Sequence, residues 1–191
     1  MTWSPRSPAE PPLVARAHAL ARRLAFERSC EPEVGALLHL LAAQRGRSRV
    51  GEIGTGAGVG AAWIVSALPP SVPFVTVELD EERAAAAAEL FASDDQVRVL
   101  RGDWHEAMPP EAPFDLLFYD GGGKQRPDLD GEQVVGLLAP GGTVVLDDLW
   151  LDAEPPDPDP VRDFWLSHPR LAAVELAVSA RMAVIVGVRA R

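Results

Sequence analysis

The sequence predicts an α/β fold, with a mostly parallel sheet of seven strands, helices on both faces and a reversed strand near the end of the chain. From Arg49 onwards, short apolar runs alternate with helical patterns, and such short crossovers give parallel strands with right-handed connections. The run Phe114–Tyr119 is almost entirely apolar, as expected for a strand buried on both faces. Only Ser179-Ala180-Arg181 separates the last two apolar runs, so we expect them to form an antiparallel hairpin.

The composition is that of an ordinary globular protein. The chain has 191 residues, of which 47% are hydrophobic and 24% charged, enough for one substantial core. Its formal net charge of −10 argues against broad nucleic-acid binding, which needs a basic surface. Cys30 is the only cysteine, which excludes an internal disulfide and a cysteine-based zinc cluster. No apolar run could span a bilayer and the first residues lack the core of a signal peptide, so we expect a cytoplasmic protein without membrane contact.

We predict a short lead-in followed by one domain. Residues 1–12 are rich in proline and are expected to form a flexible lead-in. The domain covers residues 13–191, with N-terminal helices in 13–45 and the sheet-containing core in 49–191.

Apolar periodicity and turn residues define the predicted elements. Helical spacing of apolar residues predicts a helix at Leu13–Arg28, and Pro32 suits the first turn of a second helix that continues to Leu41. The core strands are predicted at Arg49–Ile53, Phe74–Leu79, Val97–Arg101, Phe114–Tyr119, Thr143–Leu146, Leu171–Val178 and Met182–Val188. The core helices are predicted at Ala61–Leu68, Glu81–Phe91, Leu129–Leu138 and Val161–His168, with a proline-rich loop at Asp152–Pro160.

Glycine occupies every second position after the first core strand, at Gly54, Gly56, Gly58 and Gly60. A strand, a glycine-rich turn and a helix let the backbone approach a nucleotide-like ligand closely, and the helix start offers unpaired N–H groups. An ordinary tight turn is the simplest alternative. A dinucleotide site is another, but the Glu52 carboxylate would repel a pyrophosphate. A ligand with a cationic centre and no phosphate fits Glu52 better.

Four motifs, in order along the chain, resemble those of the class I S-adenosylmethionine-dependent methyltransferases. They are Glu52-Ile53-Gly54-Thr55-Gly56-Ala57-Gly58, Val77-Glu78-Leu79-Asp80, Gly102-Asp103-Trp104 and Leu138-Ala139-Pro140-Gly141-Gly142. The resemblance implies a Rossmann-like methyltransferase sandwich. It also implies that Glu78 holds the ribose hydroxyls of S-adenosylmethionine, that Asp103 accepts from the adenine amino group and that Trp104 covers the ring. The cofactor-binding residues it implies are Glu52, Gly54, Thr55, Gly56, Gly58, Gly60, Glu78, Leu79, Gly102, Asp103, Trp104 and Asp120.

Three aspartates follow the fourth and fifth predicted strands. Asp120 ends the first of these strands, and Asp147 and Asp148 end the second. If the strands are neighbours, the carboxylates converge at the edge where open α/β sheets bind ligands. Close carboxylates repel one another unless some are protonated or a cation lies between them, and an all-oxygen set favours Mg²⁺, Mn²⁺ or Ca²⁺ over zinc. Alternatively, one of the three caps a helix or faces solvent.

The segments that carry these aspartates resemble the metal-dependent O-methyltransferases of the catechol and caffeoyl-coenzyme A type. The resemblance implies that Asp120, Asp147 and Asp148 are metal ligands, although the family usually has asparagine where this chain has Asp148. It also implies Lys124 as a catalytic base near Asp120, although Lys124 lies one residue further along the chain than the family's lysine. The implied acceptor is a hydroxyl group of a small molecule, for example an aromatic diol. Homodimers are common in that family.

Two other functions are also compatible with the sequence. The irregular Asp120–Lys124 loop is compatible with an S-adenosylmethionine-binding protein that has no transferase activity. A nicotinamide-dependent oxidoreductase would use the same glycine loop, with Glu52 as the adverse feature.

Overall fold

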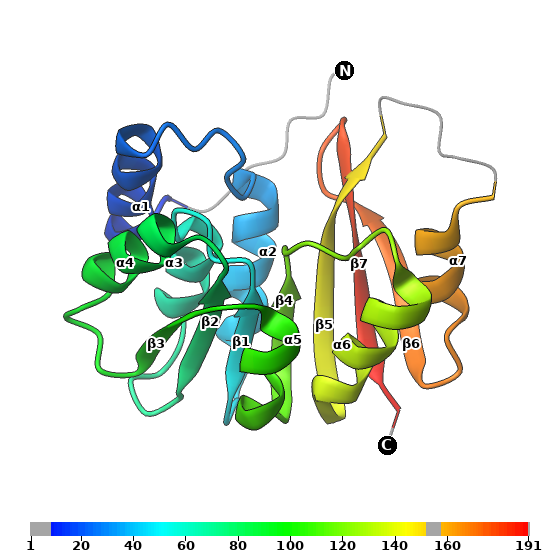
Figure 1. Ribbon diagram of the computed structural model, residues 1–191. Coiled ribbons are helices and arrows are strands. Elements are labelled where there is room, and N and C mark those ends of the chain that lie inside the picture. Colours follow the sequence, from blue (N-terminus) through cyan, green and yellow to red (C-terminus); the bar gives the residue numbers. More distant parts are fainter. Residues whose placement is uncertain (1–8, 152–157, 191) are drawn as a thin grey trace.

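Figure 1 shows the computed structural model of the chain, which describes residues 9–151 and 158–190. Within this part, seven strands form one sheet in the order β3-β2-β1-β4-β5-β7-β6. The strands are β1 (Val50–Ile53), β2 (Phe74–Glu78), β3 (Val97–Arg101), β4 (Phe114–Tyr119), β5 (Leu138–Trp150), β6 (Leu171–Ala177) and β7 (Met182–Arg189). The helices are α1 (Pro12–Arg23), α2 (Pro32–Ala42), α3 (Val59–Val65), α4 (Glu81–Leu90), α5 (Trp104–Ala107), α6 (Glu132–Leu137) and α7 (Pro160–Ser167), with a 3-10 helix η1 (Pro109–Glu111) and a π-helix η2 (Pro127–Gly131).

The direction of the strands confirms the predicted fold. Strand β7 runs antiparallel to both of its neighbours, β5 and β6, whereas all other paired strands are parallel. The short connection between β6 and β7 forms the expected hairpin, because it is too short for a crossover.

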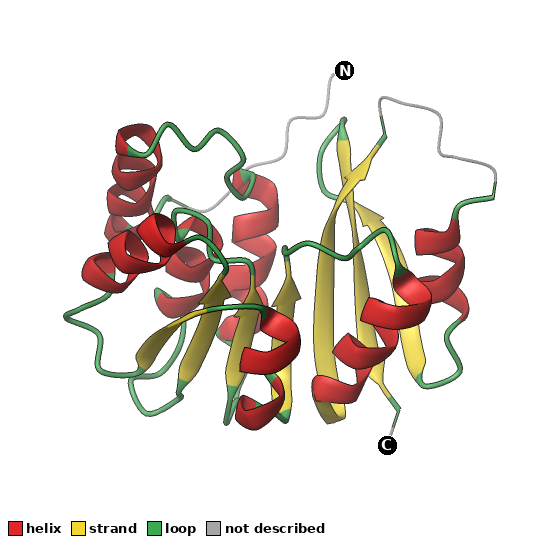
Figure 2. Ribbon diagram, in the orientation of Figure 1, coloured by secondary structure: helices red, strands yellow, loops and turns green. Residues whose placement is uncertain are grey.

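Helices cover both faces of the sheet, as Figures 1 and 2 show. Helices α1 to α4 contribute to the core on one face, and α5, α6 and α7 contribute to the core on the other. Successive residues of β4 point to opposite faces: Leu116 and Phe118 belong to the first core, and Leu117 and Tyr119 to the second. All four are fully buried, as predicted for a central parallel strand.

Several observed elements differ from the predicted ones, and α3 covers Val59–Val65 rather than Ala61–Leu68. Helix α1 ends at Arg23 rather than Arg28, because Ala25 adopts a φ of 49° and turns the chain. Strand β5 is longer than predicted at both ends. The predicted Leu129–Leu138 helix is a π-helical turn followed by the short helix α6. A further short helix, α5, occupies what was predicted to be only a loop after β3.

The strand order also determines where a ligand can bind. Strands β1 and β4 are neighbours, with Val50 opposite Leu116, so the order of strands along the sheet reverses between them. Open α/β sheets bind ligands at such a reversal, outside the carboxyl ends of the strands.

Part of the N-terminal lead-in and most of the predicted proline-rich loop, residues 1–8 and 152–157, lie outside the described residues. No helix within the described ranges is both long and apolar enough to cross a membrane.

Candidate active site

A cavity of about 540 Å³ opens at the carboxyl edge of the sheet, beside the reversal between β1 and β4. Its volume lies in the range of small-molecule pockets. The loop 54–56 and Glu78 at the end of β2 form part of its wall, and Phe26 from the α1–α2 connection covers it. Asp120 and Asp148 line the same cavity.

Gly54 lets the glycine loop lie against the segment that follows β4. Its φ is 94°, and a Cβ added there would lie 2.7 Å from the carbonyl oxygen of Asp120. Both the positive φ and the close contact therefore require glycine. The N–H groups of Gly54 and Thr55 donate to the carbonyl oxygen of Val77 at 3.0 and 3.1 Å, which ties the loop to β2.

Glu78 is buried and surrounded by hydrogen-bond donors. Its Oε2 accepts from the N–H of Gly56 at 2.8 Å, and its Oε1 accepts from the N–H of Asp80 at 2.9 Å. The Arg83 guanidinium donates to Oε1 from Nε at 3.2 Å and from Nη2 at 2.8 Å. Since a carboxylate oxygen can accept about two hydrogen bonds, Oε2 retains room for one donor from a ligand.

Glu52 lies behind the cavity wall rather than on it. Its side chain is 1% exposed, and its Oε2 accepts from the Thr76 hydroxyl at 2.6 Å. The Thr55 hydroxyl lies 2.6 Å from that of Thr76, so it is the donor of that pair if Thr76 gives its one hydrogen to Glu52. Burial raises the pKa of Glu52 well above its ordinary value, while the hydrogen bond from Thr76 opposes the shift. The prediction that the Glu52 carboxylate faces a cationic ligand is therefore corrected: it supports the glycine loop from beneath.

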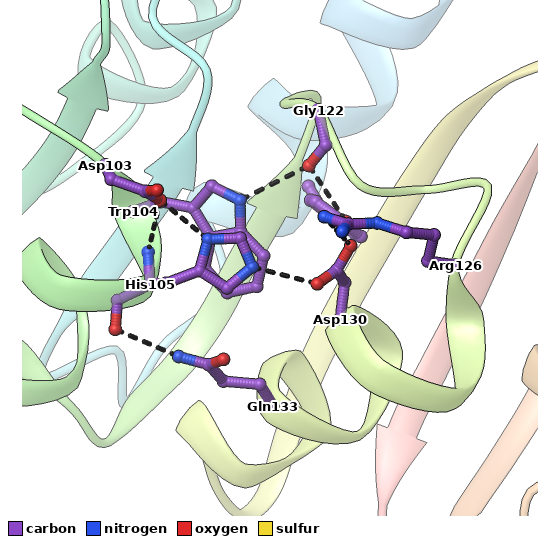
Figure 3. Close-up of polar contacts among 8 residues, drawn as sticks. Asp103, Trp104, His105, Gly122, Arg126, Asp130 and Gln133 are labelled. Atoms are coloured by element: carbon purple, nitrogen blue, oxygen red, sulfur yellow. Dashed lines mark hydrogen bonds and ion pairs between the residues drawn. The ribbon is translucent and has the colours of Figure 1, made fainter.

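The short helix α5 brings three consecutive residues to the cavity, Asp103, Trp104 and His105 (Figure 3). Asp103 caps the helix, since its Oδ1 accepts from the N–H of His105 at 3.0 Å. The rings of Trp104 and His105 stack with centroids 3.9 Å apart. Nδ1 of His105 lies 2.6 Å from Oδ1 of Asp103, and Nε2 lies 2.8 Å from Oδ1 of Asp130. This arrangement connects α5 to η2.

A β-bulge places the aspartate pair of β5. Between paired positions, β5 advances from Leu146 to Leu149 while β7 advances only from Ile185 to Ala183, so β5 has one extra residue. Asp147 and Asp148 lie in this bulge, and Asp148 has a φ of 65°. Asp147 is buried, whereas Asp148 is exposed.

Asp120 joins the pair, because β4 and β5 are neighbours and Tyr119 lies opposite Leu146. Ligand oxygens of Asp120, Asp147 and Asp148 all lie within 4.8 Å of one another. The predicted convergence of the three aspartates is therefore confirmed.

Lys124 places its ammonium group among these three carboxylates. Nζ lies 3.2 Å from Asp120 Oδ1, 2.7 Å from Asp147 Oδ1 and 2.9 Å from Asp148 Oδ2. Burial raises the pKa values of Asp120 and Asp147, and Lys124 opposes both shifts. Burial alone would lower the pKa of Lys124, but the charges of Asp147, Asp120 and Asp148 raise it well above its ordinary value. In this position Lys124 is a charged donor, and it could act as a base only after leaving the carboxylates.

The structure brings most of the predicted site residues together. The predicted residues that line the cavity are Gly54, Thr55, Gly56, Gly60, Glu78, Leu79, Gly102, Asp103, Trp104, Asp120 and Asp148. Asp147 and Lys124 join them through the carboxylate cluster. Glu52 and Gly58 are not among the lining residues, and Gly58 instead caps the start of α3 with a φ of 81°.

The polar residues that sequence reasoning missed include Arg83 and His105, which line the cavity, and Asp130, which contacts His105. Arg83 follows the helix cap Asp80 by three residues, a spacing that places it in the first turn of α4 beside the end of β2. His105 follows another acidic cap, Asp103, by two residues. Asp130 is a charged residue at the start of a predicted apolar helix, and its 3% exposure explains why it needs a partner.

The sheet order, the glycine loop and the acidic ends of β2, β4 and β5 together define a class I methyltransferase site. Comparison with known proteins agrees. Residues 52–149 match a protein family described as a methyltransferase domain. A protein of Mycobacterium tuberculosis described as a probable O-methyltransferase is 33% identical over 157 residues, which cover 79% of this chain and 69% of the relative. This chain belongs to the class I S-adenosylmethionine-dependent O-methyltransferases.

Solved structures share the fold at lower identity. The O-methyltransferase TomG from Streptomyces achromogenes, in complex with S-adenosylmethionine, has a TM-score of 0.79 at 24% identity and covers 95% of this chain and 91% of its own. An O-methyltransferase from Bacillus cereus, in complex with S-adenosylhomocysteine, has a TM-score of 0.78 at 21% identity and covers 94% and 91%. The predicted Rossmann-like methyltransferase sandwich is thereby confirmed, and the nicotinamide alternative finds no support.

Proposed function

We propose that the cavity binds S-adenosylmethionine and that the chain transfers its methyl group to a hydroxyl group of a small acceptor, with an aromatic diol as the acceptor class. The observation that carries the proposal is the single cavity that includes both Glu78 on the glycine-loop side and Asp120 and Asp148 of the carboxylate cluster. The glycine-loop side of the cavity is suited to a nucleoside, and the carboxylate side is suited to a cationic reacting centre.

The binding residues would act mainly by position. Oε2 of Glu78 would accept a hydrogen bond from the ribose, a charge-assisted interaction in a buried place. Asp103 would accept from the adenine amino group, and Trp104 would contact the ring. With the donor held in this way, the protein's main task is to align the acceptor oxygen with the methyl carbon, because the sulfonium already activates that carbon.

The carboxylate cluster fits a divalent cation by its chemistry. Asp120, Asp147 and Asp148 offer oxygen ligands within 4.8 Å of one another, as hard cations prefer. When bound there, Mg²⁺ would lower the pKa of the acceptor hydroxyl and fix its orientation. Asp148 stands where the metal-dependent O-methyltransferases usually have asparagine, and its negative charge would favour such a cation.

Lys124 would compete with this cation for the same oxygens. Its Nζ lies within 3.2 Å of all three carboxylates. It is also the only lysine in the chain. A divalent cation would therefore have to displace the ammonium, after which Lys124 or a water molecule would be able to accept the hydroxyl proton. The reaction would break the carbon–sulfur bond and form the carbon–oxygen bond, with the electron pair of the broken bond passing to sulfur.

Calorimetry tests the proposal. S-adenosylmethionine, S-adenosylhomocysteine and NAD are each titrated into the protein, once with Mg²⁺ and once with a chelator. We expect both sulfur compounds to bind and NAD not to bind, whereas the reverse result would contradict the proposal. Transfer of a labelled methyl group to a panel of catechols then tests the chemistry. Binding without transfer to any acceptor would favour a binding protein instead.

A further inference from the structure

We propose that His105 is a positioning residue for the methyl donor: by bridging Asp103 and Asp130 it holds α5 against η2 and thereby fixes one wall of the cavity. This inference rests on the proposed function. We call the three side chains the His105 bridge. Figure 3 shows the imidazole between the two carboxylates, with the indole of Trp104 lying against it.

The bridge joins elements that are separate in sequence. His105 lies in α5 and Asp130 lies in η2, 25 residues further along the chain. A second contact supports the same connection, since Nε2 of Gln133 donates to the carbonyl oxygen of His105 at 3.0 Å. Helix α5 is also held by the packing of Trp104, Ala107 and Met108 in the core and by the hydrogen bond from Trp104 to Gly122.

Asp130 needs the bridge because it is buried. Its side chain is 5% exposed, and an unpaired carboxylate at such a place is costly. Oδ1 receives His105, and Oδ2 lies 2.9 Å from Nη2 of Arg126 in an ion pair that lacks hydrogen-bond geometry. The turn before η2 is built around this carboxylate: Gly123 has a φ of 101°, and a Cβ added there would collide with Asp130 Oδ2.

The bridge bears directly on the cavity. Asp103, Trp104, His105, Gly122 and Arg126 all line it. Nε1 of Trp104 donates to the carbonyl oxygen of Gly122 at 3.3 Å, so the indole also spans from α5 to the segment after β4. His105 engages Oδ1 of Asp103 through both its ring and its backbone N–H, which fixes the carboxylate and leaves Oδ2 for a ligand.

The geometry also makes the bridge dependent on pH. Both ring nitrogens of His105 face carboxylate oxygens, and only the imidazolium can donate from both. The charged and titratable groups that face it are Asp103 from the start of α5, Asp130 from η2 and, beyond Asp130, Arg126. Burial lowers the pKa of His105, but the hydrogen bonds to Asp130 and Asp103 outweigh this effect, so the pKa lies above its ordinary value. The complete bridge is present below that raised pKa and is lost as pH rises through it.

The test measures the affinity of S-adenosylhomocysteine by calorimetry across the range from about pH 6 to pH 9, around the ordinary histidine pKa. For the native chain we expect the Kd to rise about tenfold towards high pH, as for the loss of one charge-assisted hydrogen bond. For His105→Asn we expect a Kd about tenfold higher at low pH and without the pH dependence. Glu132→Gln is the matched control: it removes a charge that pairs with His168 and Arg170, none of these residues lines the cavity, and the Kd should stay unchanged.

Titration of the His105 imidazole signals by NMR in the ligand-free protein provides a second readout. We expect a pKa above the ordinary histidine value that falls in Asp130→Asn. If S-adenosylhomocysteine does not bind the native chain at any pH, the proposed function fails. His105 then has no methyl donor to position, and the inference fails with it. An unchanged Kd and pH profile in His105→Asn, or an ordinary pKa for His105, would overturn the inference itself.

Discussion

The two sides of the cavity carry the same kind of side chain, a carboxylate at the carboxyl edge of the parallel strands, in two different settings. On the glycine-loop side, Glu78 receives two backbone N–H groups and the Arg83 guanidinium. On the other side, three carboxylates share the single ammonium of Lys124. Hydrogen-bond donors satisfy the Glu78 carboxylate in the first setting. In the second setting, three negative groups share one positive group.

This difference indicates that the two sides of the cavity have different functions, one in ligand binding and the other in the reaction. A carboxylate held by fixed backbone donors has one orientation and suits the recognition of a ligand. Burial, with the charges of the neighbouring carboxylates as a smaller cause, raises the pKa values of Asp120 and Asp147. Carboxylates in such a place favour the arrival of positive charge. We therefore assign binding to the Glu78 side and reaction to the Asp147 side, and the following predictions test that division.

The largest effect is expected for Asp147→Ala. Loss of this buried carboxylate should reduce the rate of methyl transfer about 1,000-fold, within the range for removing a group that handles charge or protons in the reaction. The affinity for S-adenosylhomocysteine should stay nearly unchanged. Asp95→Ala, at an exposed aspartate that does not line the cavity, is the control. Equal loss of binding and transfer in Asp147→Ala would abolish the distinction between the two sides.

Two glycines with nearly the same φ separate backbone strain from crowding. Gly46 has a φ of 88° with no atom within 4 Å of an added Cβ, and Gly54 has a φ of 94° with the Asp120 carbonyl 2.7 Å away. Gly46→Ala should cost about 1 kcal/mol of unfolding free energy, the cost of the left-handed conformation. Gly54→Ala should cost about 3 kcal/mol, because overpacking adds to that strain. Denaturant unfolding measures both, and equal costs would show that the loop does not depend on the close contact.

Glu78→Gln tests the binding side. The amide cannot keep charge-assisted bonds to Arg83 and the backbone, so the Kd for S-adenosylmethionine should rise about 30-fold. The rate at saturating S-adenosylmethionine should change little, because the carboxylate cluster is intact. Glu81→Gln, which removes an exposed ion pair with Arg101, should behave like the native chain. A large fall in the saturated rate would assign Glu78 to the reaction side.

Lys124→Met tests whether the three carboxylates of the reaction side can bind a divalent cation. Removing the ammonium frees three carboxylates for a divalent cation, so the affinity for Mn²⁺ should rise about tenfold, as expected when a nearby positive charge is removed. Asp148→Asn should lower the same affinity. Electron paramagnetic resonance of free Mn²⁺ measures both changes without reference to activity. If neither variant alters Mn²⁺ binding, the cluster is not a cation site.

The last prediction concerns the pH dependence of stability. The folded-state pKa of Glu52 is raised by burial, so the folded chain holds this proton at pH values where the unfolded chain has lost it. Stability should therefore fall as pH rises above the unfolded value of about 4.3, by at most about 1.4 kcal/mol per pH unit. Glu52→Gln should remove this part of the slope. Thermal unfolding between about pH 5 and pH 8 gives the comparison, and parallel curves for the two proteins would contradict it.

The fold and most of the site could be predicted because they follow from local patterns. Apolar runs, glycine spacing and acidic strand ends are readable in the sequence, and the topology then brings Asp120 to Asp147. What could not be predicted depends on packing across the sheet edge. Glu52 lies under its loop, where the Thr76 hydroxyl on the neighbouring strand donates a hydrogen bond to it, and nothing in the local sequence indicates this partner.

Partners of the buried charges were also beyond sequence reasoning. His105 meets Asp130 only after α5 and η2 have packed on the same face of the sheet. The β-bulge that re-aims Asp147 and Asp148 depends on pairing with β7, which comes from the end of the chain. Such contacts are set by tertiary structure rather than by spacing.

The most direct test is a crystal structure with S-adenosylhomocysteine and Mn²⁺, with the metal located by its anomalous scattering. We expect the ribose against Glu78, the sulfur directed towards Asp120, a metal peak among Asp120, Asp147 and Asp148, and Lys124 displaced from them. A ligand bound outside this cavity, or bound within it without touching Glu78, would contradict the central claim.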